Sequence, residues 1–363
     1  MGSLEPIATF AGQNEDWDVK YTFSSALGLI RENNLSEKDQ QIACRLLREF
    51  ASKQEHAGVC QAANQALERL QQEPAPLPRL TAKQLFDDED PPVVVDLELG
   101  AKSNLRFVRI KAAEFLIHNT SFANRLGDQA KVKLPSDVYV CCTEFPLNLF
   151  REFTESEDVD EQVRNRIRNN EFWNPNGLNQ PARNIYRSDI AIFLNWLSDK
   201  YHLIPQYDLV EHEGKTLVQL REDGTGFRLT NSIEWHYAAM AETETRCYWG
   251  SVREGGVSSL FEYFDQTDVP AETGTRIPNS FGLHDMIANV RELCDSSRVY
   301  TPYLIVKMPD NTIQSTPCIQ HGCNSKSVAK ELSRTRFFNI IDPMSAGDDL
   351  GFRVVLPLPL KKD

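Results

Sequence analysis

A chain of 363 residues, 41% hydrophobic and 25% charged, has the composition of an ordinary globular protein and can bury one large core or two modest ones. Its formal net charge of −13 disfavours a nucleic-acid partner, because phosphates attract a dense Lys/Arg stripe and the sequence contains none. No apolar run reaches the roughly 18 residues of a membrane span, and the N-terminal stretch lacks the basic start and apolar core of a signal peptide. We therefore expect a cytoplasmic protein.

The eight cysteines are too sparse for a disulfide scaffold, and without a secretory signal we expect them to be reduced thiols. Cys141 and Cys142 are adjacent, so in a strand they point to opposite faces as small apolar side chains. Cys318 and Cys323 flank His321, but a separation of four residues is not a usual zinc spacing, and no second pair of ligands accompanies it. The sequence therefore predicts no structural zinc.

The pattern of apolar and capping residues in 15–72 predicts a small helical bundle. In its clearest segment Ser36 is placed as a helix N-cap, and Ile42, Leu46 and Phe50 follow on one apolar stripe. Because such helices cannot bury their apolar faces alone, they must pack together or on another domain. Two interpretations stay open: a docking module for another protein, or an extension packed on the chain's own C-terminal domain.

A change of composition marks the end of this bundle. The stretches "QQEPAPLPRL" and "FDDEDPP" combine prolines, which resist helix formation, with acidic residues, which resist burial. We therefore expect residues 73–95 to be an acidic, proline-bearing linker that leads into a second domain at residues 96–360.

The second domain, residues 96–360, alternates short strands, long turns and helices. One helix is expected to begin at Ser188 and to bury Phe193, and another begins at Asn231, which has capping-box spacing to Glu234. Helices packed against a small, mostly antiparallel sheet make an α+β domain. The fold class predicted for the whole chain is thus α+β, with a small all-α module in front.

Seven segments of this domain carry a recognisable order of motifs. They are "RFVRIKAAEFLIHN", "VYVCCTEFPLNLFREF", "NIYRSDIAIFLNWLS", "GTGFRLTNSIEWHYAAM", "CYWG", "PNSFGLHDMIANVREL" and "LGFRVV". In this order they resemble the formylglycine-generating enzyme, or sulfatase-modifying factor, domain family over about residues 105–357. The resemblance implies that family's version of the C-type lectin-like fold, a compact core that supports long loops.

In that family the segment equivalent to residues 278–295 is a structural hub. The resemblance assigns hub positions to Asn279, Gly282, Asp285, Asn289 and Glu292. Glycine permits a close backbone turn there, and the amides and carboxylates satisfy backbone groups of the neighbouring loops. Family members often bind calcium near this segment, but here Arg291 replaces the usual Trp, and a cation beside an arginine is disfavoured. We expect no cofactor, and calcium held by Asn289 and Glu292 is the alternative.

The catalytic motifs of the family's enzymes do not match this sequence. Formylglycine-forming members need two cysteines beyond the strand turn that resembles "IQHGCNSKS", because two thiolates bind Cu(I), and the stretch after that turn contains no cysteine. Cys318 and Cys323 have the right separation but lie before or within the turn. Iron-dependent sulfoxide synthases need three histidines shared with an N-terminal domain, where only His56 occurs. We expect no catalytic residues, and a metal-dependent oxidoreductase that acts on cysteine through Cys318 and Cys323 is the alternative.

The remaining interpretation is a binding function. The segment 324–349 mixes arginines and aromatics with small polar residues, which suits a protein-contact surface. The candidate binding residues are Asn324, Lys326, Arg334, Arg336, Phe337, Asn339 and Asp342. The competing interpretation is that Arg334 and Arg336 only tie the loops to the fold.

We expect a non-catalytic binding or regulatory protein. It would contact protein partners through these C-terminal loops and through the helical module, without nucleic-acid or membrane partners. The resemblance extends to accessory proteins of bacterial signalling and defence assemblies. It also extends to variable proteins of diversity-generating retroelements, which display ligands on this scaffold, and that identity stays open as an alternative.

Overall fold

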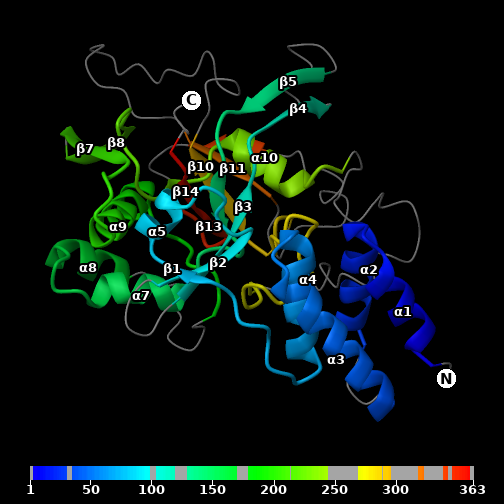
Figure 1. Ribbon diagram of the computed structural model, residues 1–363. Helices are drawn as coiled ribbons and strands as arrows, with labels where there is room; N and C mark the ends of the chain where they lie inside the picture. Colours follow the sequence, from blue (N-terminus) through cyan, green and yellow to red (C-terminus); the bar gives the residue numbers. More distant parts are fainter. Residues whose placement is uncertain are drawn as a thin grey trace.

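The computed structural model describes residues 3–30, 35–98, 104–118, 129–169, 179–212, 214–243, 269–287, 289–295, 318–322, 338–341 and 346–359. Figure 1 shows the first four helices grouped together beside two sheets and the helices that cover them. Within these ranges, no helix combines the length and the apolar character that a membrane crossing requires.

Four helices form the N-terminal module. They are α1 (Glu5–Gln13), α2 (Trp17–Gly28), α3 (Glu37–Ser52) and α4 (Ala57–Arg69). The predicted N-cap of α3 is confirmed, because the Ser36 side chain accepts from the Asp39 backbone N–H at 3.1 Å. Leu46 and Phe50 of the predicted stripe are buried in a core shared by all four helices. The bundle begins earlier than residue 15, since α1 contributes buried alanines to that core.

The segment predicted as a linker, residues 73–95, contains regular structure. It carries β1 (Arg79–Leu80), α5 (Ala82–Asp87) and the first residues of β2 (Val94–Glu98). Thr81 and Gln84 form a capping box that starts α5, and β1 pairs in parallel with β2. Prolines and acidic residues in this segment therefore separate short elements that pack on the second domain.

Two sheets form the second domain. The larger has the strand order β1-β2-β3-β6-β14-β9 and the smaller has the order β12-β11-β10-β13. Their remaining strands are β3 (Asn104–Ile110), β6 (Val138–Cys141), β9 (Arg228–Leu229), β10 (Arg291–Asp295), β11 (Cys318–His321), β12 (Phe338–Ile341), β13 (Leu350–Phe352) and β14 (Val354–Pro357). Only Arg353 separates β13 from β14, so this residue stands where the chain passes from one sheet to the other.

Two hairpins and four helices complete the described domain. The hairpins pair β4 (Ala113–His118) with β5 (Gln129–Leu134) and β7 (Tyr207–His212) with β8 (Lys215–Leu220). The helices are α7 (Leu147–Glu155), α8 (Glu161–Arg168), α9 (Arg187–Lys200) and α10 (Ser232–Met240). The capping box of Asn231 and Glu234 is confirmed at the start of α10. The predicted cap of α9 is wrong, because Tyr186 occupies the N-cap without a side-chain bond and Ser188 lies inside the helix.

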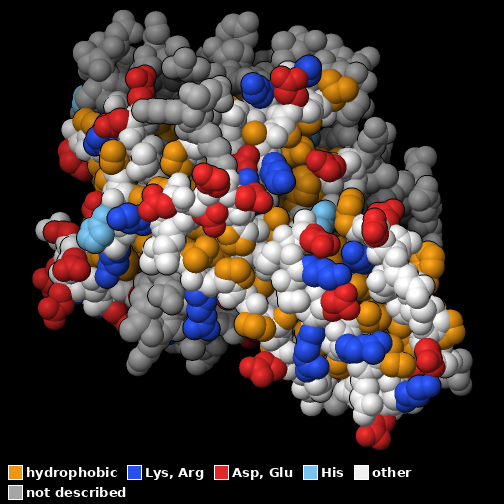
Figure 2. Space-filling view, viewed as in Figure 1, with side chains coloured by type: hydrophobic (Ala, Val, Ile, Leu, Met, Phe, Trp, Pro, Cys, Tyr) orange, Lys and Arg blue, Asp and Glu red, His pale blue; other side chains and the backbone are white. Residues whose placement is uncertain are grey.

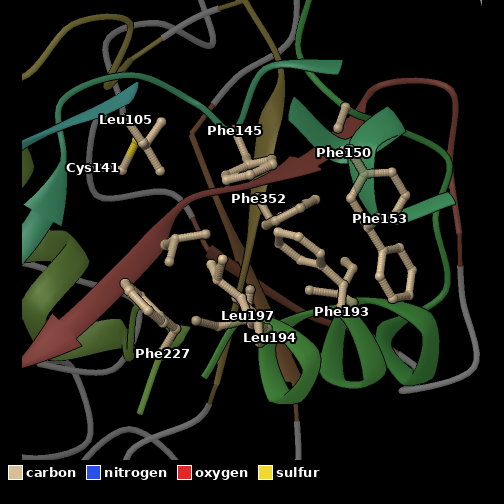
Figure 3. Packing of buried hydrophobic residues seen from close by; sticks show 14 of the residues in the cluster. Leu105, Cys141, Phe145, Phe150, Phe153, Phe193, Leu194, Leu197, Phe227 and Phe352 are labelled. Atoms are coloured by element: carbon tan, nitrogen blue, oxygen red, sulfur yellow. The ribbon is translucent and has the colours of Figure 1, made fainter. Parts of the chain in front are cut away.

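Aromatic side chains fill a core that α7 and α9 form with strands of both sheets. Phe352 of β13 stacks on Phe145 with ring centroids 5.3 Å apart, and Phe193 of α9 lies 4.9 Å from Phe145 and 5.1 Å from Phe150 (Figure 3). All of these rings are almost fully buried, and such ring pairs add to the stabilisation that apolar burial provides. The α+β class predicted from the sequence is the one observed.

Candidate functional site

The predicted hub begins with a buried turn at Asn279. Its side-chain oxygen accepts from the backbone N–H groups of Phe281 and Leu283 at 3.0 and 3.1 Å, and its amide donates to the Ala238 carbonyl at 2.7 Å. Gly282 follows with a φ of +84°, a conformation that favours glycine. One amide thus holds the turn and attaches it to α10.

The centre of the hub is a set of buried side chains around Glu144, which lies just beyond β6. The carboxylate of Glu144 accepts from Asn289 Nδ2 at 2.7 Å and from the Val290 backbone N–H at 3.0 Å. Asn289 Oδ1 accepts from the Ala271 backbone N–H at 2.8 Å, and Asp285 Oδ2 accepts from the Gly274 N–H at 2.7 Å. Asp285 and Asn289 have φ values of +60° and +75°, in the region that Asp and Asn tolerate better than most residues.

Glu292 uses both carboxylate oxygens within the fold. Its Oε1 accepts from Arg353 Nη2 at 2.7 Å, and its Oε2 accepts from the indole N–H of Trp235 at 2.7 Å. Arg353 also donates to the backbone carbonyls of Cys141 and His284, at 2.9 and 2.8 Å. Arg353 thus connects β10 and the segment containing His284 to the C-terminal end of β6.

Burial controls the protonation of this cluster. Desolvation, assisted by the charges of Asp285 and Glu292, raises the pKa of Glu144 well above its ordinary value. Desolvation also raises the pKa of Asp285 to about 6, while burial lowers the pKa of His284 to about 4. The hub therefore disfavours additional negative charge.

The residues present do not fit calcium. Glu292 already engages Arg353 and Trp235, and the Asn289 oxygen that a cation needs accepts a backbone N–H. Among the residues that the structure describes, no group of three or more His, Cys, Asp or Glu side chains is placed to hold a metal ion. The calcium alternative at Asn289 and Glu292 therefore lacks free ligands.

The cysteines that the structure describes in full are buried and unbridged. Burial raises the pKa of the Cys141 thiol to about 11 and also raises the pKa values of the Cys142 and Cys294 thiols. Of the pair considered for oxidative chemistry, Cys318 begins β11 and its Cα pairs with Asp295, whereas Cys323 lies outside the described residues.

Six of the seven candidate binding residues lie outside the residues that the structure describes: Asn324, Lys326, Arg334, Arg336, Phe337 and Asp342. Asn339 lies in β12, where its Cα pairs with Gln320 of β11. The segment 324–349 therefore runs between strands of the smaller sheet, with β12 inside it.

Sequence reasoning missed the buried charges that complete the cluster. Glu144 and Arg353 were not identified, and neither was the network in which Asp295 accepts from Arg187 at 2.6 Å and from the Tyr207 hydroxyl at 2.8 Å. The available signal was a lone charge inside an apolar stretch, as in "VYVCCTEFP" and "LGFRVVLP". Such charges are almost never fully buried unless they are paired.

The helical module packs directly on the hub. A Cβ atom added to Gly58 of α4 would lie only 2.1 Å from the Ser280 carbonyl oxygen, so the two backbones meet closely. Tyr21 donates to the Pro278 carbonyl at 2.5 Å, and Gln65 Nε2 donates to the Arg276 carbonyl at 2.8 Å. On the face shown in Figure 2, acidic and basic side chains are interspersed over the described surface.

Comparison with known proteins identifies related domains. A family model for the sulfatase-modifying factor enzyme 1-like domain matches residues 100–358. The solved structure of Treponema denticola variable protein 1 is 19% identical, with a TM-score of 0.54 over 73% of this chain and 99% of that chain. The solved structure of CarF is 18% identical, with a TM-score of 0.49 over 72% of this chain and 100% of that chain. The structure of PvdO from Pseudomonas aeruginosa is 17% identical, with a TM-score of 0.49 over 72% of this chain and 98% of that chain. No curated protein sequence matches the chain.

These structural similarities concern the fold alone, because all three identities are below 20%. The family match and the fold shared with Treponema denticola variable protein 1 place the second domain in the C-type lectin-like fold that the sequence motifs implied.

Proposed function

Because the chain belongs to the sulfatase-modifying factor enzyme 1-like domain family, we propose that it is a non-catalytic binding or regulatory protein built on this scaffold. The observation that carries the proposal is that the polar side chains of the hub already bind other groups of the fold. Glu292 is saturated by Arg353 and Trp235, and Glu144 is saturated by Asn289 and the Val290 N–H. These groups support loops, so specificity belongs to the loops that they support.

The proposed contact surface is the segment 324–349. In the sequence it follows β11, includes β12 and precedes β13, and these three strands belong to the smaller sheet. Its Arg336 and Phe337 are of the residue types that contribute most to protein interfaces. The first function is therefore recognition of a protein partner through this segment.

The helical module would supply a second contact. Ile7 and Phe10 of α1 lie about one turn apart and are 62% and 60% exposed. Neighbouring apolar side chains on a helix surface are typical of interaction sites. Two contact surfaces on one chain suit an accessory protein of a bacterial signalling or defence assembly.

The test compares partner capture by two matched double variants of the full chain. Arg336→Ala with Phe337→Ala removes one cation and one large apolar side chain from the proposed surface. Lys215→Ala with Leu220→Ala makes the same kind of change on exposed positions of β8. We expect the first variant to lose a partner that the wild type and the control both retain, with a melting temperature close to that of the wild type.

Two outcomes oppose this function. Equal capture by all three proteins would remove the segment from the contact surface. A marked fall in melting temperature for the first variant would favour the interpretation in which the arginines tie the loops to the fold.

Ligand display by a variable protein is the second candidate function. The observation that favours it is the shared fold with Treponema denticola variable protein 1, which aligns over almost its full length. Under this function, substitutions among natural copies of this chain would concentrate in the segment 324–349. Sequencing of those copies tests it, since an even spread of substitutions would contradict it.

A further inference from the structure

The hairpin of β7 and β8 lies at the periphery of the second domain, beside α9 (Figure 1). Within the part of the chain that the structure describes, its strands pair only with each other, so the hairpin has two outer edges. The edge of β8 is engaged at Val218, whose carbonyl accepts from Arg187 Nη1 at 3.2 Å. Because Arg187 is the first residue of α9, this bond ties that edge to the helix.

The edge of β7 presents four free backbone groups. Tyr207 uses both of its backbone groups on Asn195, since its N–H donates to Oδ1 at 3.1 Å and its carbonyl accepts from Nδ2 at 2.8 Å. Tyr207 therefore directs its N–H and C=O away from β8, and every second residue of an antiparallel strand does the same. Leu209 and Glu211 are those residues. Both are exposed, and no described residue bonds to the N–H or C=O of either.

Such an edge is a template for another strand, and proteins commonly block it with proline, lysine or a bulge. The sequence of β7, "YDLVEH", contains neither residue, and its register with β8 is uninterrupted. Asn195 closes the edge only at Tyr207. The row of donors and acceptors that stays open fits an extended segment, because strand addition satisfies alternate residues of an edge.

We propose that β7 pairs antiparallel with β7 of a second copy of this chain, so that two hairpins form one continuous sheet. The two-fold axis passes through Val210. Leu209 of each copy then lies opposite Glu211 of the other, and each such pair exchanges both backbone hydrogen bonds. This arrangement uses all the free backbone groups of both edges. The same patch serves both copies, which is the commonest symmetry of soluble dimers.

The other two-fold registers that align these outward groups are less favourable. An axis through Leu209 would place Glu211 opposite Tyr207 of the second copy, whose backbone groups Asn195 already holds. An axis through Glu211 would place two carboxylates directly opposite each other, which destabilises a sheet. The backbone bonding and the charges therefore select the same register.

The side chains of the selected register are complementary. Val210 lies opposite Val210 of the second copy, and β-branched pairs of this kind stabilise sheets. Asp208 lies opposite His212 of the second copy, whose imidazole carries an N–H donor in either protonation state. Within its own chain Asp208 Oδ1 accepts from Arg221 Nη1 at 3.1 Å, whereas no described group bonds to its Oδ2. That oxygen is the acceptor for His212.

This contact lies outside the segment 324–349 and the helical module, so it goes beyond the proposed function and does not depend on it. Two short strands make a contact smaller than a standard protein interface, and the association is accordingly weak and reversible. Each copy has a net charge of −13, so salt that screens the repulsion favours the pairing.

Cysteine cross-linking of the full chain tests the contact. Val210→Cys places two thiols at the two-fold axis, where the Cα separation of an antiparallel pair is within the range that a disulfide spans. Lys215→Cys, at an exposed position of β8, is the matched control. With a mild oxidant in about 0.15 M salt, we expect a covalent dimer of Val210→Cys, while the control and the wild type stay at background. A yield of Val210→Cys dimer no higher than that of the control overturns the proposal.

Two further substitutions in the Val210→Cys background separate backbone pairing from side-chain contact. Leu209→Pro removes the outward N–H and leaves the bonds to β8 in place, a position where an edge strand tolerates proline. It should abolish the cross-link with little change in melting temperature. Leu209→Ala keeps the N–H, so the cross-link should persist. Equal loss in both variants would assign the contact to the apolar side chain, and persistence in both would exclude the backbone, so either result overturns the strand pairing.

A mixing experiment tests the register without proline. Asp208→Cys and His212→Cys, prepared separately and mixed, should form a disulfide between the two variants, because these positions face each other across the axis. Neither variant alone should form a dimer above background, since its two thiols would lie several residues apart along the paired strands. Dimers of either variant alone at the yield of the mixture contradict the register and overturn the proposal.

Discussion

The Nη2 atom of Arg353 lies 2.7 Å from the Oε1 atom of Glu292, and both side chains are buried. Arg353 stands between β13 of the smaller sheet and β14 of the larger one, and Glu292 lies in β10. The remaining guanidinium donors bind two backbone carbonyls, so the positive charge is fully surrounded by acceptors. This pair joins the two sheets at the point where the chain crosses between them.

Glu292→Gln should strongly destabilise the protein. The substitution keeps the shape of the side chain but leaves the charge of Arg353 buried without its counter-ion, which typically costs about 3–5 kcal/mol. Urea denaturation measures the change in the free energy of unfolding. Glu5→Gln, which removes the partner of exposed Lys38, is the control and should leave the free energy of unfolding almost unchanged. A loss below about 1 kcal/mol for Glu292→Gln would show that the pair is dispensable.

Substitutions at Asn289 should separate backbone strain from lost hydrogen bonds. Asn289→Gly removes the bonds to Glu144 and Ala271 but suits a φ of +75°, so we expect a loss of about 1–3 kcal/mol in unfolding free energy. Asn289→Ala should cost about 1 kcal/mol more, because alanine resists that conformation. If a chelator lowers the melting temperature of the wild type, calcium binds here and the structural interpretation of Asn289 is wrong.

Local signals made part of this fold predictable. The caps at Ser36 and Asn231 identified α3 and α10, because a cap is formed by residues three positions apart in the sequence. The two-residue strand β1 was not predictable in the same way. It exists because β2, more than a dozen residues later, provides its partner, and no property of "RL" alone indicates a strand.

The hub was only partly predictable for a similar reason. The motif around residues 278–295 identified Asn289 and Glu292 through family resemblance. Glu144 lies 145 residues from Asn289 in the chain, and its role depends on long-range packing that a single sequence does not display. The contact between Gly58 and Ser280 was equally hidden, because a glycine within a helix carries no signal of what approaches it.

Asp285→Asn should stabilise the protein at neutral pH. It should also remove the part of the pH dependence of folding stability that comes from the titration of Asp285. The folded-state pKa of Asp285 is about 6, above the unfolded value of about 3.9, so the folded protein binds more protons between these values. The stability that Asp285 contributes is thus present below about pH 4 and is lost as the pH rises through 6. Asn keeps an oxygen to accept from the Gly274 N–H and tolerates the positive φ.

We expect the advantage of the Asp285→Asn variant over the wild type to grow by about 2 kcal/mol between pH 4.5 and pH 7.5. Urea denaturation of both proteins across this range gives the difference directly. His56 and His284 also titrate in this interval on unfolding, but they contribute equally to both proteins and cancel. Glu144 does not cancel, because the charge of Asp285 raises its pKa, and its titration adds to the advantage of the variant in the same direction. A difference that does not depend on pH would mean that Asp285 is ionised in the folded state throughout the range.

The protein should not convert cysteine to formylglycine. The described thiols of Cys141, Cys142 and Cys294 are buried with raised pKa values, which disfavours the thiolate that Cu(I) requires. Incubation with copper and a peptide that contains Cys-x-Pro-x-Arg, followed by mass measurement, should give no aldehyde above a protein-free control. Conversion that disappears in Cys323→Ala would establish the oxidoreductase alternative.

Removal of the first 94 residues should prevent independent folding of the second domain. Such a chain loses β1, α5 and Val94 of β2, and it also loses Ala57 and Cys60, which are buried in the same core as Trp235. The surface around Ser280 and Gly282, which α4 covers closely, would become exposed. We therefore expect the fragment to aggregate or to melt without a cooperative transition, as followed by circular dichroism and light scattering.

Co-expression of residues 1–94 as a separate chain provides the control. If missing packing is the cause, the fragment supplied in trans should restore solubility and a cooperative transition, because α2 and α4 can return to the hub through the contacts of Tyr21 and Gln65. Gly58→Val in that fragment should block the rescue, since its Cβ alone would approach the Ser280 carbonyl oxygen to 2.1 Å. A cooperative, soluble fragment without any partner would instead make the helical module a separable docking unit joined by a linker, which is the organisation that the proline-rich segment suggested from sequence alone.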